Sequence, residues 1–373
     1  MPLFIHGIGT ASPPFSISQE HAARMAERFG CRDAEQQRQL KTLYRLTRVR
    51  QRQSVVLESD GLEEEPRQSF FPDMRDATDR GPTTSARMAR YEADAPVLAT
   101  AAGRAALADA RIEPEIITHV VTVSCTGFAA PGFDLALVRE LGLRRDVERT
   151  HIGFMGCHAA LNGLRVARAY ADATPDACVI VCAVELCTLH YQYGWDPAQM
   201  VANALFGDGA AALIGRAQPP AMPKAGTEAG AQDCWALAAN GATLLEDSAE
   251  LMTWRVGDRG FGMTLSARVP GVIQQRLRPW LDGWLASHDV ALDHVATWAL
   301  HPGGPRILEA CGQVLGLSRE AYAVSQEVLA AHGNMSSPTM LFILDVLRRR
   351  NAPRPCVALG FGPGLAVEAA LFL

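Results

Sequence analysis

Three polar residues stand at breaks between apolar segments and could together carry chemistry. Cys157 follows a glycine and precedes an Ala- and Leu-rich stretch, His301 ends an apolar run, and Asn334 follows another glycine. A thiolate is a nucleophile, an imidazole can activate it, and an amide N–H can stabilise a developing oxyanion. This set suits acyl transfer through a thioester. It also suits decarboxylative carbon–carbon bond formation, in which an enolate attacks a Cys-bound acyl group. Neither reaction requires a metal or a tightly bound cofactor.

The sequence around Cys157 predicts a strand–helix junction. Gly156 permits a sharp bend, and residues 159–171 are rich in helix formers. A cysteine at a helix start lies near free N–H groups and the positive end of the helix dipole, which favour the thiolate. The apolar run 178–184 predicts a strand covered on both faces. For each residue alone a structural role stays open: a buried core cysteine, a structural histidine and a turn asparagine.

Composition predicts an intracellular globular protein. The chain has 373 residues, 48% of them hydrophobic, and a net charge of −5. This length allows two domains or one large domain with two cores, and the slight acidity argues against non-specific nucleic-acid binding. Nine scattered cysteines without zinc-like spacing indicate reduced thiols in the cytoplasm. Because no apolar run approaches ~18 residues, we expect no membrane insertion, and we see no signal peptide.

Alternating strand-like and helix-like segments predict an α/β fold. The expected strands are residues 3–9, 119–125 and 295–300, and the expected helices are residues 18–46, 91–110, 270–288, 305–315 and 320–331. Ser336 or Ser337 fits a helix N-cap with Pro338 at the first helical position. Residues 57–84 indicate a surface excursion.

Two glycine motifs indicate an internal duplication. Phe206-Gly-Asp-Gly and Phe361-Gly-Pro-Gly each precede an apolar final strand. Since each closes a run of strands and helices, we expect two similar α/β halves packed against each other. Residues 1–216 would carry the nucleophile Cys157, and residues 217–373 would carry His301 and Asn334.

Four motifs in register over nearly the whole chain resemble those of the type III polyketide synthases, the chalcone/stilbene synthase superfamily. They are Gly-Phe-Met-Gly-Cys157, His301-Pro-Gly-Gly-Pro, Gly-Asn334-Met-Ser-Ser-Pro and Gly360-Phe-Gly-Pro-Gly-Leu. The match is weakest over residues 57–84 and 217–250. The resemblance implies a thiolase-like fold, a duplicated five-layered αβαβα arrangement and a homodimer.

The resemblance also implies a reaction. Cys157 would take a starter acyl group from an acyl-CoA, and His301 would hold Cys157 as a thiolate within an ion pair. His301 and Asn334 would stabilise the enolate that malonyl-CoA gives on losing carbon dioxide. Repeated extension and cyclisation would yield a pyrone or a phenolic ring. CoA thioesters are the expected substrates, with no cofactor, no metal and no obligatory acyl carrier protein.

The resemblance assigns further residues to a substrate cavity. Phe206 matches a phenylalanine at the junction of CoA tunnel and cavity, and Met263 stands where plant chalcone synthases have a second phenylalanine. Trp254 replaces a glycine of those enzymes and would fill part of the plant-type cavity, and Ala130 replaces a methionine that reaches into the partner subunit. These departures resemble bacterial members that make alkylpyrones, alkylresorcinols or tetrahydroxynaphthalene.

Two indications about the product compete. Cys125 matches a cavity cysteine of tetrahydroxynaphthalene synthases, whereas Thr126 and Cys187 match the acyl tunnel of some long-chain relatives. The other expected substrate-binding residues are Gly303, Gly304, Gly362 and Pro363. The resemblance places Lys41, Arg45 and Arg48 where CoA phosphates bind. The basic cluster Thr47-Arg-Val-Arg-Gln-Arg52 fits either a solvated face or a clamp for the phosphates of an anionic ligand.

Three other functions share some of these residue types. An initiating ketoacyl-acyl-carrier-protein synthase also uses Cys, His and Asn, but the His301-Pro-Gly-Gly and Gly360-Phe-Gly-Pro-Gly motifs argue against it. A papain-like Cys/His/Asn hydrolase has its nucleophile near the mature N-terminus, unlike Cys157. A non-catalytic scaffold would make the cavity residues incidental.

Overall fold

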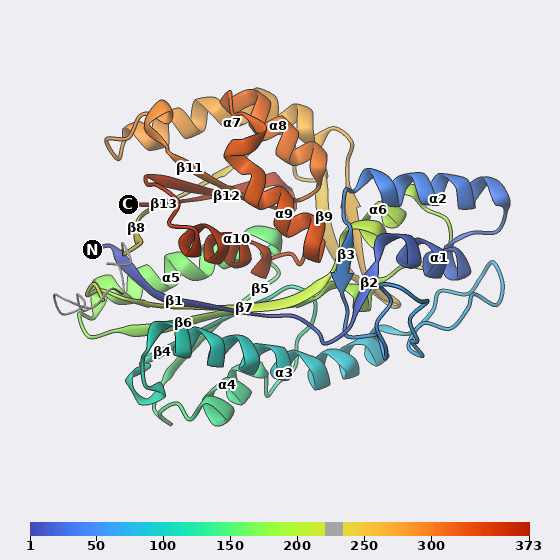
Figure 1. Ribbon diagram of the computed structural model, residues 1–373, viewed down its shortest axis with the longest axis horizontal. Coiled ribbons are helices and arrows are strands. Elements are labelled where there is room, and N and C mark those ends of the chain that lie inside the picture. The colour runs from blue at the N-terminus through green and yellow to red at the C-terminus, as the bar shows by residue number, and fades with distance from the viewer. Residues whose placement is uncertain (221–233) are drawn as a thin grey trace.

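The computed structural model describes residues 1–220 and 234–373, and the expected weak match over 217–250 therefore lies partly outside the described residues. The chain folds into five layers, helix–sheet–helix–sheet–helix, which are stacked from bottom to top in Figure 1. This arrangement confirms the duplicated αβαβα fold that the resemblance implies.

The first half is built on five strands. They are β1 (Leu3–Ala11), β4 (His119–Ser124), β5 (Glu148–Gly153), β6 (Cys178–Leu186) and β7 (Asp208–Arg216). Their order is β1-β7-β6-β4-β5. β4 runs parallel to β5 and β6, whereas β6 pairs antiparallel with β7, and β7 antiparallel with β1. The outer face of this sheet packs against α3 (Thr84–Ala110) and α4 (Phe133–Leu141), as Figure 1 shows.

The second half repeats this topology. Its strands are β8 (Ala236–Leu244), β11 (Thr297–Leu300), β12 (Cys356–Gly362) and β13 (Ala366–Phe372), in the order β11-β12-β13-β8. β11 is parallel to β12, and the next two pairings are antiparallel, as for β4, β6, β7 and β1. α7 (Val269–Ala286) and α8 (Pro305–Leu315) cover its outer face. Two residue pairs join β1 to β8 and make one sheet of the two halves. The division between residues 216 and 217 stays a prediction.

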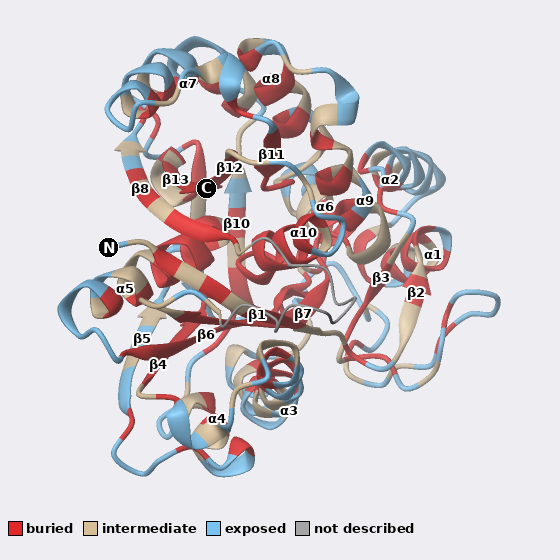
Figure 2. Cartoon of the chain, turned by 60° about the vertical axis from the view of Figure 1, so that its left-hand side comes forward, coloured by how far each residue is buried: buried red, intermediate tan, exposed pale blue. Residues whose placement is uncertain are grey.

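The middle layer consists of α5 (Ala159–Ala173) and α10 (Pro338–Arg349). Both begin beside predicted functional residues and pack into one core with the inner faces of both sheets. Figure 2 shows α10 mostly red, whereas the second half of α5 reaches the surface. Ser337 occupies the N-cap position of α10 as expected, but its hydroxyl makes no capping hydrogen bond. It donates instead to the buried side chain of Glu185 at 2.7 Å, because a buried polar group is costly unless it is hydrogen-bonded.

The remaining elements frame the site. They are α1 (Gln19–Gly30), α2 (Ala34–Leu46), α6 (Pro197–Leu205), α9 (Ala323–His332), β2 (Ser16–Ser18), β3 (Gln51–Gln53), β9 (Met252–Gly257) and β10 (Gly260–Leu265). Short 3₁₀ helices span Pro114–Ile116, Gly156–His158, Cys187–His190, Leu292–His294, Arg319–Tyr322 and Pro363–Leu365. The expected helix over 18–46 is two helices, because the Asp33 side chain caps a new start. Within the described ranges, no helix is long and apolar enough to cross a membrane.

Candidate active site

Cys157 lies in the 3₁₀ turn that joins β5 to α5, as the strand–helix prediction requires. The turn depends on Gly156, whose φ of +80° is rarely adopted by other residues. A Cβ at Gly156 would also lie 2.2 Å from the Pro363 Cδ. The glycine therefore lets the closing loop of the second half pack directly on the nucleophile's turn.

Asn334 reaches the same point from the second half. Its backbone forms a bridge with Phe206, in which the Asn334 N–H donates to Leu205 O at 2.9 Å and the Gly207 N–H donates to Asn334 O at 3.0 Å. The Asn334 Oδ1 accepts from the Ser336 N–H at 2.7 Å. This fixes the amide, so that its Nδ2 faces the Cys157 Sγ at 3.9 Å. The structure thus brings together two residues predicted from distant motifs.

His301 follows β11 and is fully buried. Its N–H donates to Leu359 O at 2.8 Å, yet neither ring nitrogen has a hydrogen-bond partner in the part of the chain described. Burial, reinforced by the nearby His158, lowers the pKa of His301 to about 3, which the neighbouring Asn334 opposes. The effect of Asn334 on the pKa of His301 puts the imidazole beside the predicted amide.

The pKa shifts of Cys157 and His301 run against the expected thiolate–imidazolium pair, which stays a prediction. Burial raises the pKa of Cys157 to about 11, although the side chains of Ser336 and Asn334 oppose the shift. Cys157 is half-buried and lines a mostly apolar cavity, and desolvation there outweighs the favourable effect of the helix start on the thiolate. Both shifts favour a neutral thiol and a neutral imidazole.

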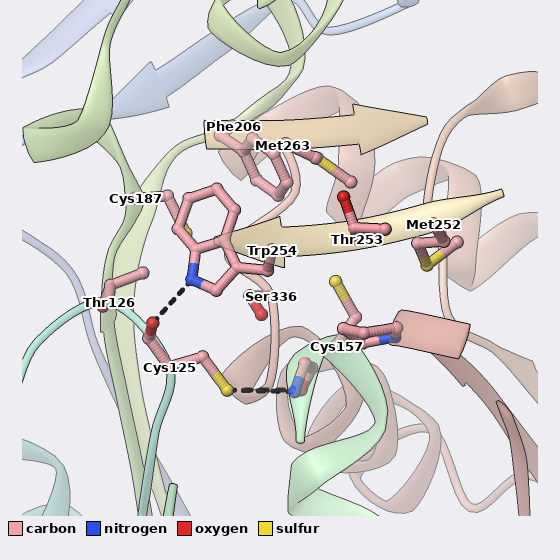
Figure 3. A pocket seen from close by; sticks show the side chains of 12 residues that line it. Cys125, Thr126, Cys157, Cys187, Phe206, Met252, Thr253, Trp254, Met263 and Ser336 are labelled. Atoms are coloured by element: carbon pink, nitrogen blue, oxygen red, sulfur yellow. Dashed lines mark hydrogen bonds between the residues drawn. The ribbon is translucent and has the colours of Figure 1, made fainter. Parts of the chain in front are cut away.

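A small cavity of about 30 Å³ lies above Cys157, and Figure 3 shows its lining. Trp254 occupies the middle of it and donates from Nε1 to Cys125 O at 2.7 Å. The Cys125 Sγ in turn accepts from the Gly156 N–H at 3.0 Å. Of the predicted substrate-binding residues, the following line this cavity: Cys125, Thr126, Cys187, Phe206, Trp254, Met263 and Pro363.

Three predicted substrate-binding residues lie elsewhere. Gly303 and Gly304 line a separate apolar pocket of about 280 Å³ between α2, α6 and the start of α8. Gly362 lines neither space, because it packs against His158, whose Cδ2 would lie 2.4 Å from an added Cβ. Phe206 and Met263 pack together with Leu265, which lines the outer pocket. These two side chains therefore stand between the outer pocket and the inner cavity.

The predicted CoA-binding cations lie on or just after α2, and none lines the outer pocket. Lys41 forms an ion pair with Glu27 at 3.1 Å, and Arg48 forms one with Glu309 at 2.8 Å. Arg45 is exposed and has no ion pair with any residue the structure describes. Contact with CoA stays a prediction for all three.

Sequence reasoning missed several residues of the site. Met252, Thr253 and Ser336 line the cavity. Glu185, on β6, is fully buried and accepts from Cys125 N–H at 2.9 Å, Thr126 Oγ1 at 2.8 Å and Ser337 Oγ. Burial raises the pKa of Glu185 to about 7. The sequence does carry a signal for Glu185, since it is the one acidic residue in an otherwise apolar strand.

Comparison with known proteins identifies this architecture. The chalcone and stilbene synthase N-terminal domain matches residues 2–219, and the C-terminal domain of the same family matches residues 236–373. The chain belongs to the chalcone and stilbene synthase family. It is thus a type III polyketide synthase, an acyltransferase of a family that uses CoA thioesters without a carrier protein.

Three similar proteins extend over most of the chain. The alpha-pyrone synthesis polyketide synthase-like Pks18 of Mycobacterium tuberculosis is 33% identical over 375 residues, covering 99% of this chain and 90% of that protein. The 1,3,6,8-tetrahydroxynaphthalene synthase of Streptomyces peucetius is 37% identical over 259 residues, 68% of this chain and 67% of that one. The crystal structure of PKS-I from the brown alga Ectocarpus siliculosus superposes with a TM-score of 0.87 at 30% identity. The superposition covers 100% of this chain and 98% of that one. Family membership confirms the resemblance and removes the hydrolase and scaffold alternatives.

Proposed function

We propose that the protein loads a short acyl starter onto Cys157, extends it with malonyl-CoA and cyclises the chain to a pyrone or a phenolic ring. The observation that carries the proposal is the Asn334 amide, fixed with its Nδ2 facing the Cys157 sulfur beside a ring whose nitrogens are unpartnered. No cofactor is needed, because every bond made or broken belongs to the two thioesters and Cys157.

Loading begins from the neutral pair. As the Cys157 sulfur attacks the acyl-CoA carbonyl, its proton passes to His301, and that proton leaves with the CoA sulfur. Malonyl-CoA then loses carbon dioxide, and the electron pair of the broken bond forms an enolate. N–H groups of Asn334 and His301 stabilise the enolate oxygen. Its carbon attacks the Cys157 thioester, and the sulfur is released as the new carbon–carbon bond forms.

The small inner cavity supports a short starter. Binding sites for small molecules usually measure ~300–1,000 Å³, far more than the cavity over Cys157. Trp254 takes up this space, so a long acyl chain has no room while its indole stays hydrogen-bonded to Cys125 O. Of the two competing indications, the cavity therefore favours the small aromatic or pyrone products over long-chain ones.

The outer pocket supports a CoA route. It is apolar where a pantetheine arm would lie, and Leu43, Leu46 and Thr47 at the end of α2 form one wall. The phosphates of CoA would meet the cations on or just after α2, namely the exposed Arg45 and the ion-paired Lys41 and Arg48. Phe206 and Met263 would then part to admit the acyl end.

A second copy of the chain is the partner we propose. β5 is an edge strand whose residues are half-buried or exposed. Phe128, Phe154 and Met155 expose large apolar surfaces next to it, which is unusual for a monomer. Sedimentation at several concentrations tests this homodimer.

All nine cysteines are free, which supports the cytoplasm as the location of the protein.

One experiment tests the proposed reaction. The protein is incubated with a panel of acyl-CoAs and malonyl-CoA, without carrier protein, and the products are weighed by mass spectrometry. We expect carbon dioxide release and cyclised products from short starters, and neither from Cys157→Ala. A wild-type protein that releases no carbon dioxide from malonyl-CoA with any starter contradicts the proposal.

A further inference from the structure

Arg52, on β3, is a fully buried arginine beside the segment that carries Phe206. Its Nη1 donates two hydrogen bonds, one to Asn203 O at 2.9 Å and one to Phe206 O at 3.0 Å. Phe206 is the residue whose backbone bridges to Asn334. One guanidinium group therefore holds the main chain where a cavity-wall residue and a proposed catalytic residue meet.

The backbone around this meeting point leaves little space. An added Cβ at Gly207 would lie 2.3 Å from His332 O and 3.2 Å from the Arg52 Cβ. An added Cβ at Gly333, whose φ is +70°, would lie 2.8 Å from Leu205 O and 3.6 Å from the same Arg52 atom. Arg52 therefore packs against both segments of the bridge as well as bonding one of them.

β3 is attached to the second half on either side of Arg52. The Arg50 N–H donates to Ala330 O at 2.8 Å, and the Gln53 Oε1 pairs with the His332 Nδ1 at 2.9 Å. The chain from residue 330 to Asn334 is thus held along one short strand. A substitution of Arg52 would therefore disturb the strand that holds residues 330–334, including Asn334.

The charge of Arg52 is not balanced by a neighbouring acid. Among residues 1–220 and 234–373, no carboxylate lies within ion-pair distance of it, and its Nε and Nη2 have no hydrogen-bond partner. The guanidinium carbon lies 5.5 Å from the Tyr44 ring centroid and 5.9 Å from that of Tyr191, which compensates in part. Burying a cation in this way is costly, and the two hydrogen bonds to Asn203 O and Phe206 O offset part of that cost.

We propose that Arg52 is a positioning residue, which holds Phe206 and Asn334 in register so that the Asn334 amide faces Cys157. This inference rests on the proposed function, in which Asn334 acts on the enolate. Loading of Cys157 depends less on that amide than decarboxylation does. Loss of Arg52 should therefore slow decarboxylation of malonyl-CoA more than it slows acylation of Cys157.

Arg87 offers a matched control. It is also fully buried, donates to the backbone oxygens of Leu189 and Tyr191, and lies over an aromatic ring, that of Phe71. Its Nη2 also lacks a partner in the described structure. It makes no contact with Phe206 or Asn334 among the hydrogen bonds of the described residues. Arg52→Lys and Arg87→Lys therefore remove comparable buried groups, only one of which holds the bridge.

The test compares the two steps in both variants. Acylation of Cys157 is followed by intact mass in a single turnover with an acyl-CoA, and decarboxylation by carbon dioxide released from malonyl-CoA. We expect Arg52→Lys to lower decarboxylation roughly tenfold relative to acylation, since a displacement of ~1 Å can cost up to about 100-fold. Arg87→Lys should leave the ratio of the two steps unchanged.

A second measurement does not depend on activity. The amides of Gly207 and Asn334 should exchange their hydrogens faster in Arg52→Lys and at the wild-type rate in Arg87→Lys. The inference is overturned if both steps fall by one factor in Arg52→Lys, or if these amides stay protected. A wild-type protein that neither acylates nor decarboxylates would contradict the proposed function, and hydrogen exchange would still decide whether Arg52 holds the bridge.

Discussion

The Nδ2 of Asn334 lies 3.9 Å from the Cys157 sulfur, although 177 positions separate the two residues in the chain. Each stands just before one of the two central helices, Cys157 before α5 and Asn334 before α10. The internal duplication places these two helix starts side by side, and the two halves then contribute different chemical groups to one site. A nucleophile from one half and an N–H donor from the other meet because the fold repeats.

Asn334→Asp replaces the N–H donor with an oxygen of similar size and keeps an acceptor for the Ser336 N–H. We expect decarboxylation of malonyl-CoA to fall by ~10²–10³, as when an oxyanion loses a preorganised donor. Acylation of Cys157, followed by intact mass, should fall much less. Wild-type decarboxylation in this variant would show that Asn334 does not stabilise the enolate.

The raised pKa of Cys157 predicts slow alkylation near neutral pH. Because burial raises the pKa of Cys157 to about 11, its thiolate fraction still increases between pH 9 and pH 10. The rate of reaction with iodoacetamide should therefore keep rising over this pH range. The rate for Cys157 is obtained by peptide mass spectrometry, with Cys157→Ala identifying the contribution of the other eight cysteines. A rate already at its plateau at pH 7 would instead show a resting thiolate.

Trp254→Ala should enlarge the cavity over Cys157. The indole lies between Cys125 and Phe206, and the substitution also removes its hydrogen bond to Cys125 O. We expect longer acyl-CoA starters to be accepted, so that heavier products appear by mass spectrometry. Trp284→Ala is the control, because that tryptophan stacks on Trp280 of the outer helix α7. An unchanged range of starters in Trp254→Ala would mean that the indole does not limit chain length.

Local patterns were sufficient for most of the helices and strands, and the family resemblance supplied most of the residues that line the cavity. Glycine before Cys157 and before Asn334 marked two turns that the structure requires, and the paired Phe-Gly-X-Gly motifs marked the duplication. The helix over 18–46 was predicted as one, because its break depends on a single capping side chain, that of Asp33. Gly303 and Gly304 line the outer pocket and not the inner cavity, a distinction that nothing in the local sequence makes, and their contact with substrate stays a prediction.

The protonation of the site could not be predicted from local sequence. The thiolate prediction used the helix start near Cys157 and the ion pair with His301 that the resemblance implies, whereas the pKa shift is dominated by desolvation from residues in both halves. Ser337 was predicted as a helix cap for a similar reason. Its hydroxyl donates a hydrogen bond instead to Glu185, which lies 152 positions earlier in the chain.

Glu185 should make the stability of the protein fall as pH rises. Burial raises its pKa from 4.5 to about 7, so between these values the folded protein binds more protons than the unfolded chain. The free energy of unfolding therefore decreases across this window, by at most ~3 kcal/mol for this group. Urea unfolding at pH 5 and pH 8 should show this loss in the wild type and a smaller loss in Glu185→Gln. The exposed Glu115→Gln is the control and should match the wild type. Equal pH dependence in Glu185→Gln and the wild type would show that this carboxyl is ionised throughout, held so by its hydrogen bonds from Cys125 and Thr126.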